Sequence, residues 1–311
     1  MMGVAVAGAL GGMTTTANAG AFATSVLTID NFFIGTGSTA GGDFAVLSQS
    51  DFDVLTGANT STVVATRDGV FSTENSAGAS PITAPPLDLA QTCIGAGCDP
   101  FAENDFSHTA IPAGSEYVLA DMSLTGSTIN LTGLPPTGGA TANTRADSMM
   151  FASEVPGSAV SEIALTSDIS FSLLTNTAVT FEFDATPYLA VGLDATATDP
   201  SSYAIANLNF TFTLTDANGS VVAGFNDFAL NTTRSVNGPG AKFPAAYDPG
   251  TLSYSVTSGL LDKDQTYTLT VDHKSAAKSM TVAEPASLAL MGLGLVGLGA
   301  MARRQKNKSQ A

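Results

Sequence analysis

The chain has 311 residues, of which 27 are acidic and 11 basic, so its formal net charge is −16. Lys and Arg that are so few and so scattered cannot form the basic surface that nucleic-acid phosphates require, which excludes a nucleic-acid binder. A hydrophobic content of 44% with only 12% charged residues excludes a disordered acidic chain. The 31 Gly, the lack of Trp and the abundance of Thr, Val and Phe favour strands joined by turns.

The first nineteen residues have the features of a secretory signal peptide. Residues 3–12 form an uninterrupted run of small and apolar residues, and Ala17-Asn18-Ala19 gives the small-x-small pattern that signal peptidase accepts. The pattern predicts cleavage after Ala19 and a mature chain that begins at Gly20. Because no Lys or Arg precedes the apolar run, a start further upstream and a buried N-terminal element are the alternatives.

The first half of the body contains several segments that favour strands, at 26–34, 44–55, 63–71 and 117–131. A long stretch over 74–113 is rich in Gly, Pro, Ser and Asp, and we expect an irregular surface excursion there. Residues 134–144 have the composition of a linker or a long loop, so the body forms one large domain or divides near this segment. The only helix that we expect in the body lies over 145–155.

The excursion contains the only two cysteines of the chain. Cys93 and Cys98 lie close together with two glycines between them, which in an exported protein predicts a disulfide rather than a metal or redox site. Asp99, Glu103 and Asp105 follow directly. Such oxygen-rich loops hold Ca²⁺ in some extracellular domains, but the spacing matches no known calcium loop, so a solvated acidic loop is the favoured interpretation.

The second half shows regular alternation of apolar and polar residues. Residues 208–215 alternate over eight positions, and the same period of two recurs at 179–185 and 267–272. Asn218-Gly219 follows the first of these segments and predicts a tight hairpin. Strands with one buried and one wet face predict an all-β fold, an antiparallel β-sandwich or jelly roll.

No catalytic constellation stands out in this body. His273 follows Asp272 at the end of an expected strand, and we expect it to be exposed, while His108 lies in the irregular stretch. No Ser or Cys occurs in a nucleophile-elbow context, so a catalytic triad has no support, and no cofactor is expected. Carboxylate pairs for glycoside cleavage are numerically available, but the Trp platforms typical of sugar-acting proteins are missing.

The C-terminus has three consecutive parts. Val282-Ala283-Glu284-Pro285 is followed by an apolar segment at 286–302, whose length is at the lower limit for crossing a bilayer, and then by a basic end that begins with Arg303 and Arg304. This layout resembles the PEP-CTERM sorting signal of exported proteins from Gram-negative bacteria that make exopolysaccharide. Glu284, Pro285, the Leu/Gly-rich segment and the two arginines match the family pattern. Ala283 replaces the usual first Pro, which bears on cleavage efficiency.

The resemblance covers about thirty residues and implies a transpeptidase-like exosortase as the processing partner. The chain then divides into a signal peptide at 1–19, a β-sandwich at 20–282 and a sorting signal at 283–311, with a transmembrane helix at 286–302. A permanent, uncut membrane anchor is the alternative. The mature part has 26 acidic and 7 basic residues, a net charge of −19 (7 − 26).

Together these features predict a non-enzymatic structural or adhesive protein of the cell surface or extracellular matrix, anchored transiently in the inner membrane. A module that binds polysaccharide or calcium, and a polysaccharide-acting enzyme, are the second and third hypotheses. Self-association through exposed strand edges is a further expectation.

Overall fold

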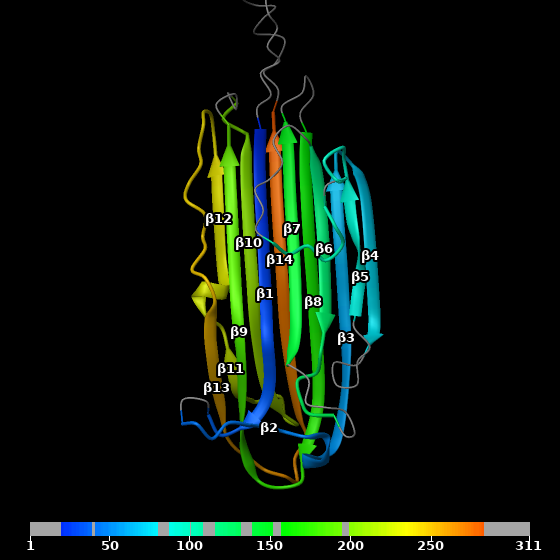
Figure 1. Ribbon diagram of the computed structural model, residues 1–311, viewed down its shortest axis with the longest axis vertical. Coiled ribbons are helices and arrows are strands. Elements are labelled where there is room, and N and C mark those ends of the chain that lie inside the picture. Colours follow the sequence, from blue (N-terminus) through cyan, green and yellow to red (C-terminus); the bar gives the residue numbers. More distant parts are fainter. Residues whose placement is uncertain are drawn as a thin grey trace, which may run out of the picture.

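The computed structural model describes residues 20–38, 41–79, 87–99, 101–107, 116–131, 139–151, 157–194 and 199–282. In these residues the fold is a sandwich of two antiparallel sheets of seven strands each (Figure 1). Sheet I has the order β13-β9-β1-β7-β6-β5, with β2 beside β1. Sheet II has the order β11-β10-β14-β8-β3-β4, with β12 beside β10. The all-β prediction and the antiparallel pairing are therefore confirmed.

The strands of sheet I are β1 (Gly20–Thr36), β2 (Ala45–Val46), β5 (Leu87–Ile94), β6 (Tyr117–Thr125), β7 (Ala140–Phe151), β9 (Thr177–Leu193) and β13 (Leu252–Leu261). Those of sheet II are β3 (Phe52–Arg67), β4 (Val70–Ala79), β8 (Gly157–Leu173), β10 (Tyr203–Asp216), β11 (Val221–Phe225), β12 (Asn231–Asn237) and β14 (Tyr267–Thr281). Two short 3₁₀ turns, η1 (Gln49–Asp51) and η2 (Phe228–Leu230), complete the described elements. Strands from both sides of 134–144 pair within the same sheets.

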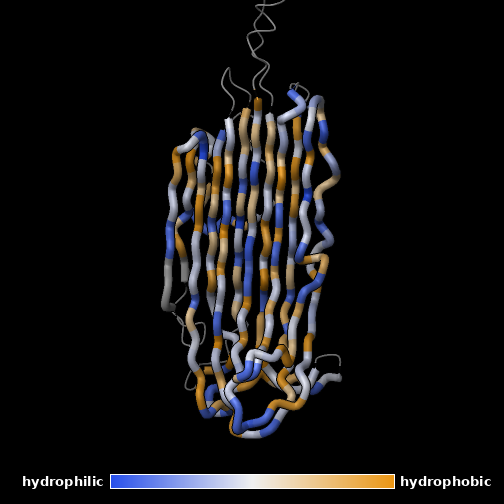
Figure 2. The backbone as a smooth tube through the Cα atoms, turned by 180° about the vertical axis from the view of Figure 1, so that it is seen from behind, coloured by the Kyte–Doolittle hydropathy of each residue, from blue (hydrophilic) through white to orange (hydrophobic). Residues whose placement is uncertain are grey.

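Alternating polarity builds the long strands of the second half. On β8, β10 and β14 buried residues alternate with residues that reach solvent over almost the full length. Figure 2 shows the same succession of hydrophilic and hydrophobic residues along the tubes. The predicted segments at 179–185, 208–215 and 267–272 lie in β9, β10 and β14, so these strand predictions are confirmed.

Several local predictions are wrong. The segment 63–71 is not one strand, because the chain reverses at Asp68 and Gly69 between β3 and β4, where both residues have positive φ, 48° and 81°. A two-residue hairpin requires this conformation, and Asp-Gly supplies it. The supposedly irregular stretch over 74–113 contains β5 and most of β4. The expected helix at 145–155 is strand β7 as far as Phe151.

The hairpin at Asn218-Gly219 is present with a different geometry. Only Gly219 has a positive φ, 80°, and its N–H donates to the carbonyl of Asp216 at 2.9 Å. The Asp216 carboxylate also accepts the N–H groups of Asn218 and Ser220 at 2.8 and 2.9 Å. This is a type I turn that ends in a left-handed glycine, which explains the register shift next to it.

The core changes character along the sandwich. At the end remote from Gly20 and Thr281 it is an aromatic cluster in which neighbouring ring centroids are 5.0–6.5 Å apart; its members include Phe32, Phe181, Phe183, Phe210, Phe212 and Phe225. Toward the other end small residues fill the interior. There the Ser25 hydroxyl donates to the Asn207 carbonyl of the opposite sheet at 2.7 Å. Because serine is short, the backbones lie closer than the usual ~10 Å between sheets.

Candidate functional site

A buried ion pair lies on the outer face of sheet I. Arg145 and Asp147 are alternate residues of β7, so their side chains lie on the same face of the strand. This face is the outer one, because the preceding Thr144 points inward to His273. The two side chains are nevertheless only 1% and 0% exposed. Arg145 Nε donates to Asp147 Oδ2 at 2.8 Å. Asp121 of β6, directly opposite Arg145, is buried beside the pair. Side chains on the outer face of a sheet are buried only where another segment packs over them. That segment must also supply hydrogen-bond partners, because buried charges without partners are costly.

The loop after β5 is that covering segment. The predicted disulfide between Cys93 and Cys98 is present, and it turns the chain back over β6 and β7. The ring of Phe101 then lies over the Arg145 guanidinium, 4.8 Å from the ring centroid. Arg145 Nη1 also donates to the carbonyl of Asp105 at 2.8 Å, and the N–H of Asn104 donates to Asp121 Oδ2 at 2.8 Å.

The three acidic candidates for calcium do different things in this loop. Asp99 is exposed, Glu103 Oε1 accepts the N–H of Gln91 at 2.6 Å, and Asp105 accepts the N–H of Ser107 at 3.0 Å. Across the part of the chain that the structure describes, no three His, Cys, Asp or Glu side chains are grouped as metal ligands would be. Calcium binding at Asp99, Glu103 and Asp105 therefore stays a prediction.

The ionisation of the cluster follows from its burial. Removal from water raises the pKa of Asp147, and the neighbouring Arg145 opposes this shift. Burial likewise raises the pKa of the Tyr117 hydroxyl. Hydrogen bonds from Ser107 lower the pKa of Asp105. Arg145 and Asp147 were not predicted from the sequence, although a polar pair at alternate positions of a strand is the pattern of an outward-facing cluster.

His273 is placed differently from the prediction. It is not at the end of the strand, because β14 continues eight residues beyond it. Its side chain points between the sheets and is only 1% exposed. Its Nε2 is 2.9 Å from the Thr144 hydroxyl, which in turn is 2.7 Å from the Ser275 hydroxyl. Desolvation lowers the pKa of His273 to about 3, so the ring is neutral at neutral pH.

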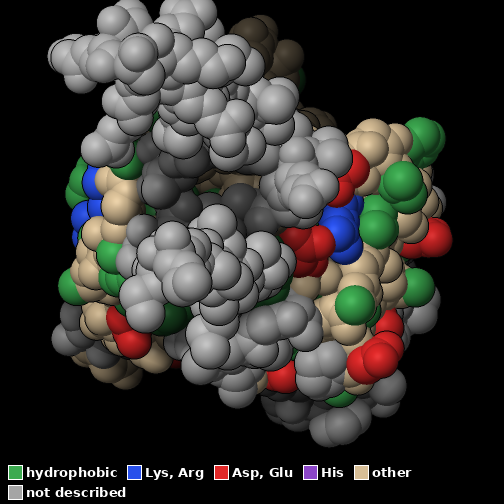
Figure 3. Space-filling view, turned by 90° about the horizontal axis from the view of Figure 1, so that it is seen from above, with side chains coloured by type: hydrophobic (Ala, Val, Ile, Leu, Met, Phe, Trp, Pro, Cys, Tyr) green, Lys and Arg blue, Asp and Glu red, His purple; other side chains and the backbone are tan. Residues whose placement is uncertain are grey.

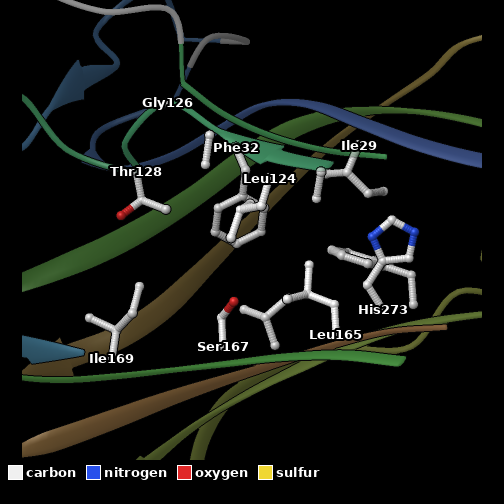
Figure 4. A pocket seen from close by; sticks show the side chains of 13 residues that line it. Ile29, Phe32, Leu124, Gly126, Thr128, Leu165, Ser167, Ile169 and His273 are labelled. Carbon is white, nitrogen blue, oxygen red and sulfur yellow. The ribbon is translucent and has the colours of Figure 1, made fainter. Parts of the chain in front are cut away.

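His273 stands at one end of an internal cavity (Figure 4). The cavity has a volume of about 50 Å³ and is lined mainly by apolar side chains, with Gly126 and Thr128 at the opposite end. For comparison, an engineered apolar cavity of about 150 Å³ accommodates benzene. The hydroxyls of Thr144 and Ser275 are buried, so this group lacks the open access that a nucleophile and its substrate require.

The outer face of sheet II contrasts with that of sheet I. Its two central strands, β8 and β14, carry three acids and two lysines on this face, a charge of −1 (2 − 3); they are Glu162, Asp168, Asp272, Lys274 and Lys278. Many of the other side chains are Thr, Ser and Asn, and cross-strand hydrogen bonds such as Thr166 to Asp272 (2.7 Å) and Thr270 to Asp168 (2.6 Å) order them. Two shallow hollows, of about 250 and 290 Å³, lie here over β3 and β8.

Both ends of the body lie at one end of the sandwich, where β1 begins and β14 ends (Figure 1). Viewed onto this end, acidic and basic side chains lie side by side (Figure 3). Arg67, the last residue of β3, pairs with Glu116, which directly precedes β6. The signal residues Ala17 and Ala19 and the motif residues Glu284, Pro285, Arg303 and Arg304 lie outside the described residues, as does the predicted helix at 286–302. Within the described ranges no helix is long and apolar enough to cross a membrane.

Comparison with known proteins identifies one feature. The model of the PEP-CTERM protein-sorting motif matches residues 281–305. No curated protein and no solved structure matches the chain.

Proposed function

Because the chain is a PEP-CTERM sorting-signal protein, exported and processed by exosortase, we propose that its sandwich is a non-enzymatic structural or adhesive component of the cell surface or extracellular matrix. One observation carries the proposal. The matched motif starts at Thr281, which is also the last residue of β14. Cleavage within the motif therefore leaves every strand of the sandwich in place, and the product is a complete β-domain.

The position of the two ends supports this role. Gly20 and Thr281 lie at the same end, so a tail held in the membrane would leave the whole sandwich projecting outward. The longest strands have 17 residues, which corresponds to a length of about 55 Å at ~3.3 Å per residue. A long, acidic and hydrogen-bonded domain of this kind suits a spacer or a cohesive element outside the cell.

The experiment compares producing cells that carry the wild-type chain, a Pro285→Ala motif variant and a deletion of the whole chain. We expect the wild-type protein in the surface and matrix fraction, the motif variant in the membrane fraction, and weaker cohesion of the surface material in the deletion strain. The size distribution of the polysaccharide should be equal in all three. A polysaccharide that becomes longer when the chain is deleted would instead indicate an enzyme.

A second candidate function is supported by the outer face of sheet II. A surface that is nearly neutral in net charge and rich in hydroxyl and amide groups is chemically suited to an extended polysaccharide, and the two hollows would accept protruding groups. Co-sedimentation with the producer's own polysaccharide tests this function. A Thr166→Lys substitution should weaken binding, and Thr251→Lys, at an exposed threonine next to β13 of sheet I, serves as the control.

A further inference from the structure

The sandwich has four lateral strand edges, two for each sheet. An edge strand presents unpaired N–H and C=O groups, and soluble proteins protect such edges with short strands, bulges, charges, proline or a covering loop. Among the described strands, β5 and β13 form the edges of sheet I, while β4 and the β11/β12 side form those of sheet II. The two edges of each sheet are protected to different degrees.

One edge of each sheet is protected. On β5 the pairing shifts between Leu89 and Thr92, and Glu103 of the covering loop accepts the N–H of Gln91 between them. On the other sheet, β11 has only five residues and contains a bulge near its start. The neighbouring β12 carries Arg234, whose guanidinium lies 5.5 Å from the ring centroid of Tyr247.

The β4 edge has no such device along its first half. The residues that flank its two-residue turn, Arg67 and Val70, bond to each other, and alternate residues do the same further along the hairpin. Phe71 and Thr73 therefore point their N–H and C=O groups away from β3. The strand has ten residues, no proline and a single charge, Glu74, and Phe71 is 70% exposed.

The β13 edge is equally bare. Odd-numbered residues of β9 direct their N–H groups toward this side, since Val179 donates to Ser258 Oγ and Leu189 to the Tyr247 carbonyl. Their partners on β13 are its even-numbered residues, so Ser253 and Ser255 point their backbone groups outward. The strand has ten residues, none of them charged or proline, and its bulge lies beyond Thr257.

We propose that β4 of one copy pairs with β13 of the next copy, so that the exported protein assembles head to tail. Figure 1 shows these two strands on opposite sides of the sandwich, so each copy can accept one neighbour on either side and the chain of copies stays open. Pairing of β4 with itself would bring two Glu74 carboxylates together, whereas β13 offers an uncharged partner. This proposal rests on the proposed structural function and gives it a mechanism.

The test uses the exported protein purified from the producing cells. Thr73→Pro removes a free N–H from β4, and Ser253→Pro removes one from β13, without loss of a backbone hydrogen bond to the neighbouring strand. The hydrogen bond from the Ser253 hydroxyl to Asp184 (2.6 Å) is lost in the proline variant and in its valine control alike. The matched controls, Thr73→Val and Ser253→Val, keep these N–H groups. Size-exclusion chromatography with light scattering and electron microscopy follow the assembly, and circular dichroism verifies the fold.

We expect the wild type and both valine variants to form concentration-dependent ladders and filaments, and each proline variant alone to be a monomer. A mixture of the two proline variants should give a dimer and nothing larger, because each variant keeps one intact edge. A monomeric wild type would overturn the inference, as would a dimer that only Ser253→Pro abolishes. Either result would leave the location of the protein at the cell surface untouched, so the proposed function is tested separately.

Discussion

The burial of His273 predicts a specific pH dependence of stability. The pKa of its ring is about 3 in the folded state, against about 6.5 in an unfolded chain. Between these values the unfolded state binds more protons, so the free energy of unfolding rises with pH by about 1.4 kcal/mol per unit and levels off above pH 6.5. Between pH 4 and pH 7 this single residue should contribute about 3 kcal/mol.

The assay is urea unfolding of the wild type and of His273→Leu at several pH values. Leucine cannot titrate, and the Thr144 hydroxyl keeps Ser275 as a partner in the variant. The comparison is needed because Asp147, whose pKa is raised, contributes in the opposite direction: its stabilisation is lost as the pH rises through its folded pKa. We expect the difference in stability between the two proteins to change by about 3 kcal/mol from pH 4 to pH 7. Parallel pH profiles would refute the burial of a neutral His273.

Three further predictions concern stability and are tested by the same unfolding measurement at neutral pH. Arg145→Met leaves the Asp147 carboxylate buried without its partner and should cost about 3–5 kcal/mol, whereas replacing both residues with apolar ones should restore most of the loss; equal stability of the single and double variants would contradict the buried pair. Ala142→Val fills part of the internal cavity and should stabilise the protein by about 1 kcal/mol, and a loss would mean that the cavity lacks room. Gly69→Ala places a side chain at a φ of 81° and should cost about 1–2 kcal/mol, while an unchanged stability would exclude the left-handed turn.

Alternation of polarity was sufficient to find the strands of the second half. On β10 and β14 one face is wet and the other is buried, so the period of two is visible in the residues themselves. The same rule does not apply to β6 and much of β7, where both faces are buried, although β6 lies within the segment 117–131 that was predicted to be a strand. There the covering loop hides the outer face, so Arg145 and Asp147 are polar residues without solvent, and the sequence pattern indicated a helix instead.

Two other differences have local causes. Asp68-Gly69 is a strong hairpin signal, but the residues on both sides of it favour strands, so one continuous strand was predicted over 63–71. His273 was expected near a strand end because Asp272 and Lys274 flank it. These charged neighbours face solvent on the outer side of β14, and the alternation of the strand then places His273 inside.

The disulfide was predictable because the spacing of Cys93 and Cys98 and the export signals agree with each other. The role of the loop behind it was not, since Phe101, Asp105 and Arg145 are brought together only by the tertiary fold. The sorting motif was the most readable feature of the chain, because its function depends on a short linear pattern rather than on packing.

We propose that the sandwich is exported and then released from its sorting signal as an intact domain. Intact mass spectrometry of the protein recovered from the cell surface and medium is the decisive experiment. We expect a species that begins at Gly20 and ends between Val282 and Pro285, with any attached group appearing as additional mass. A protein that keeps residues 1–19 and 286–311 and is found in the cytoplasm would contradict it.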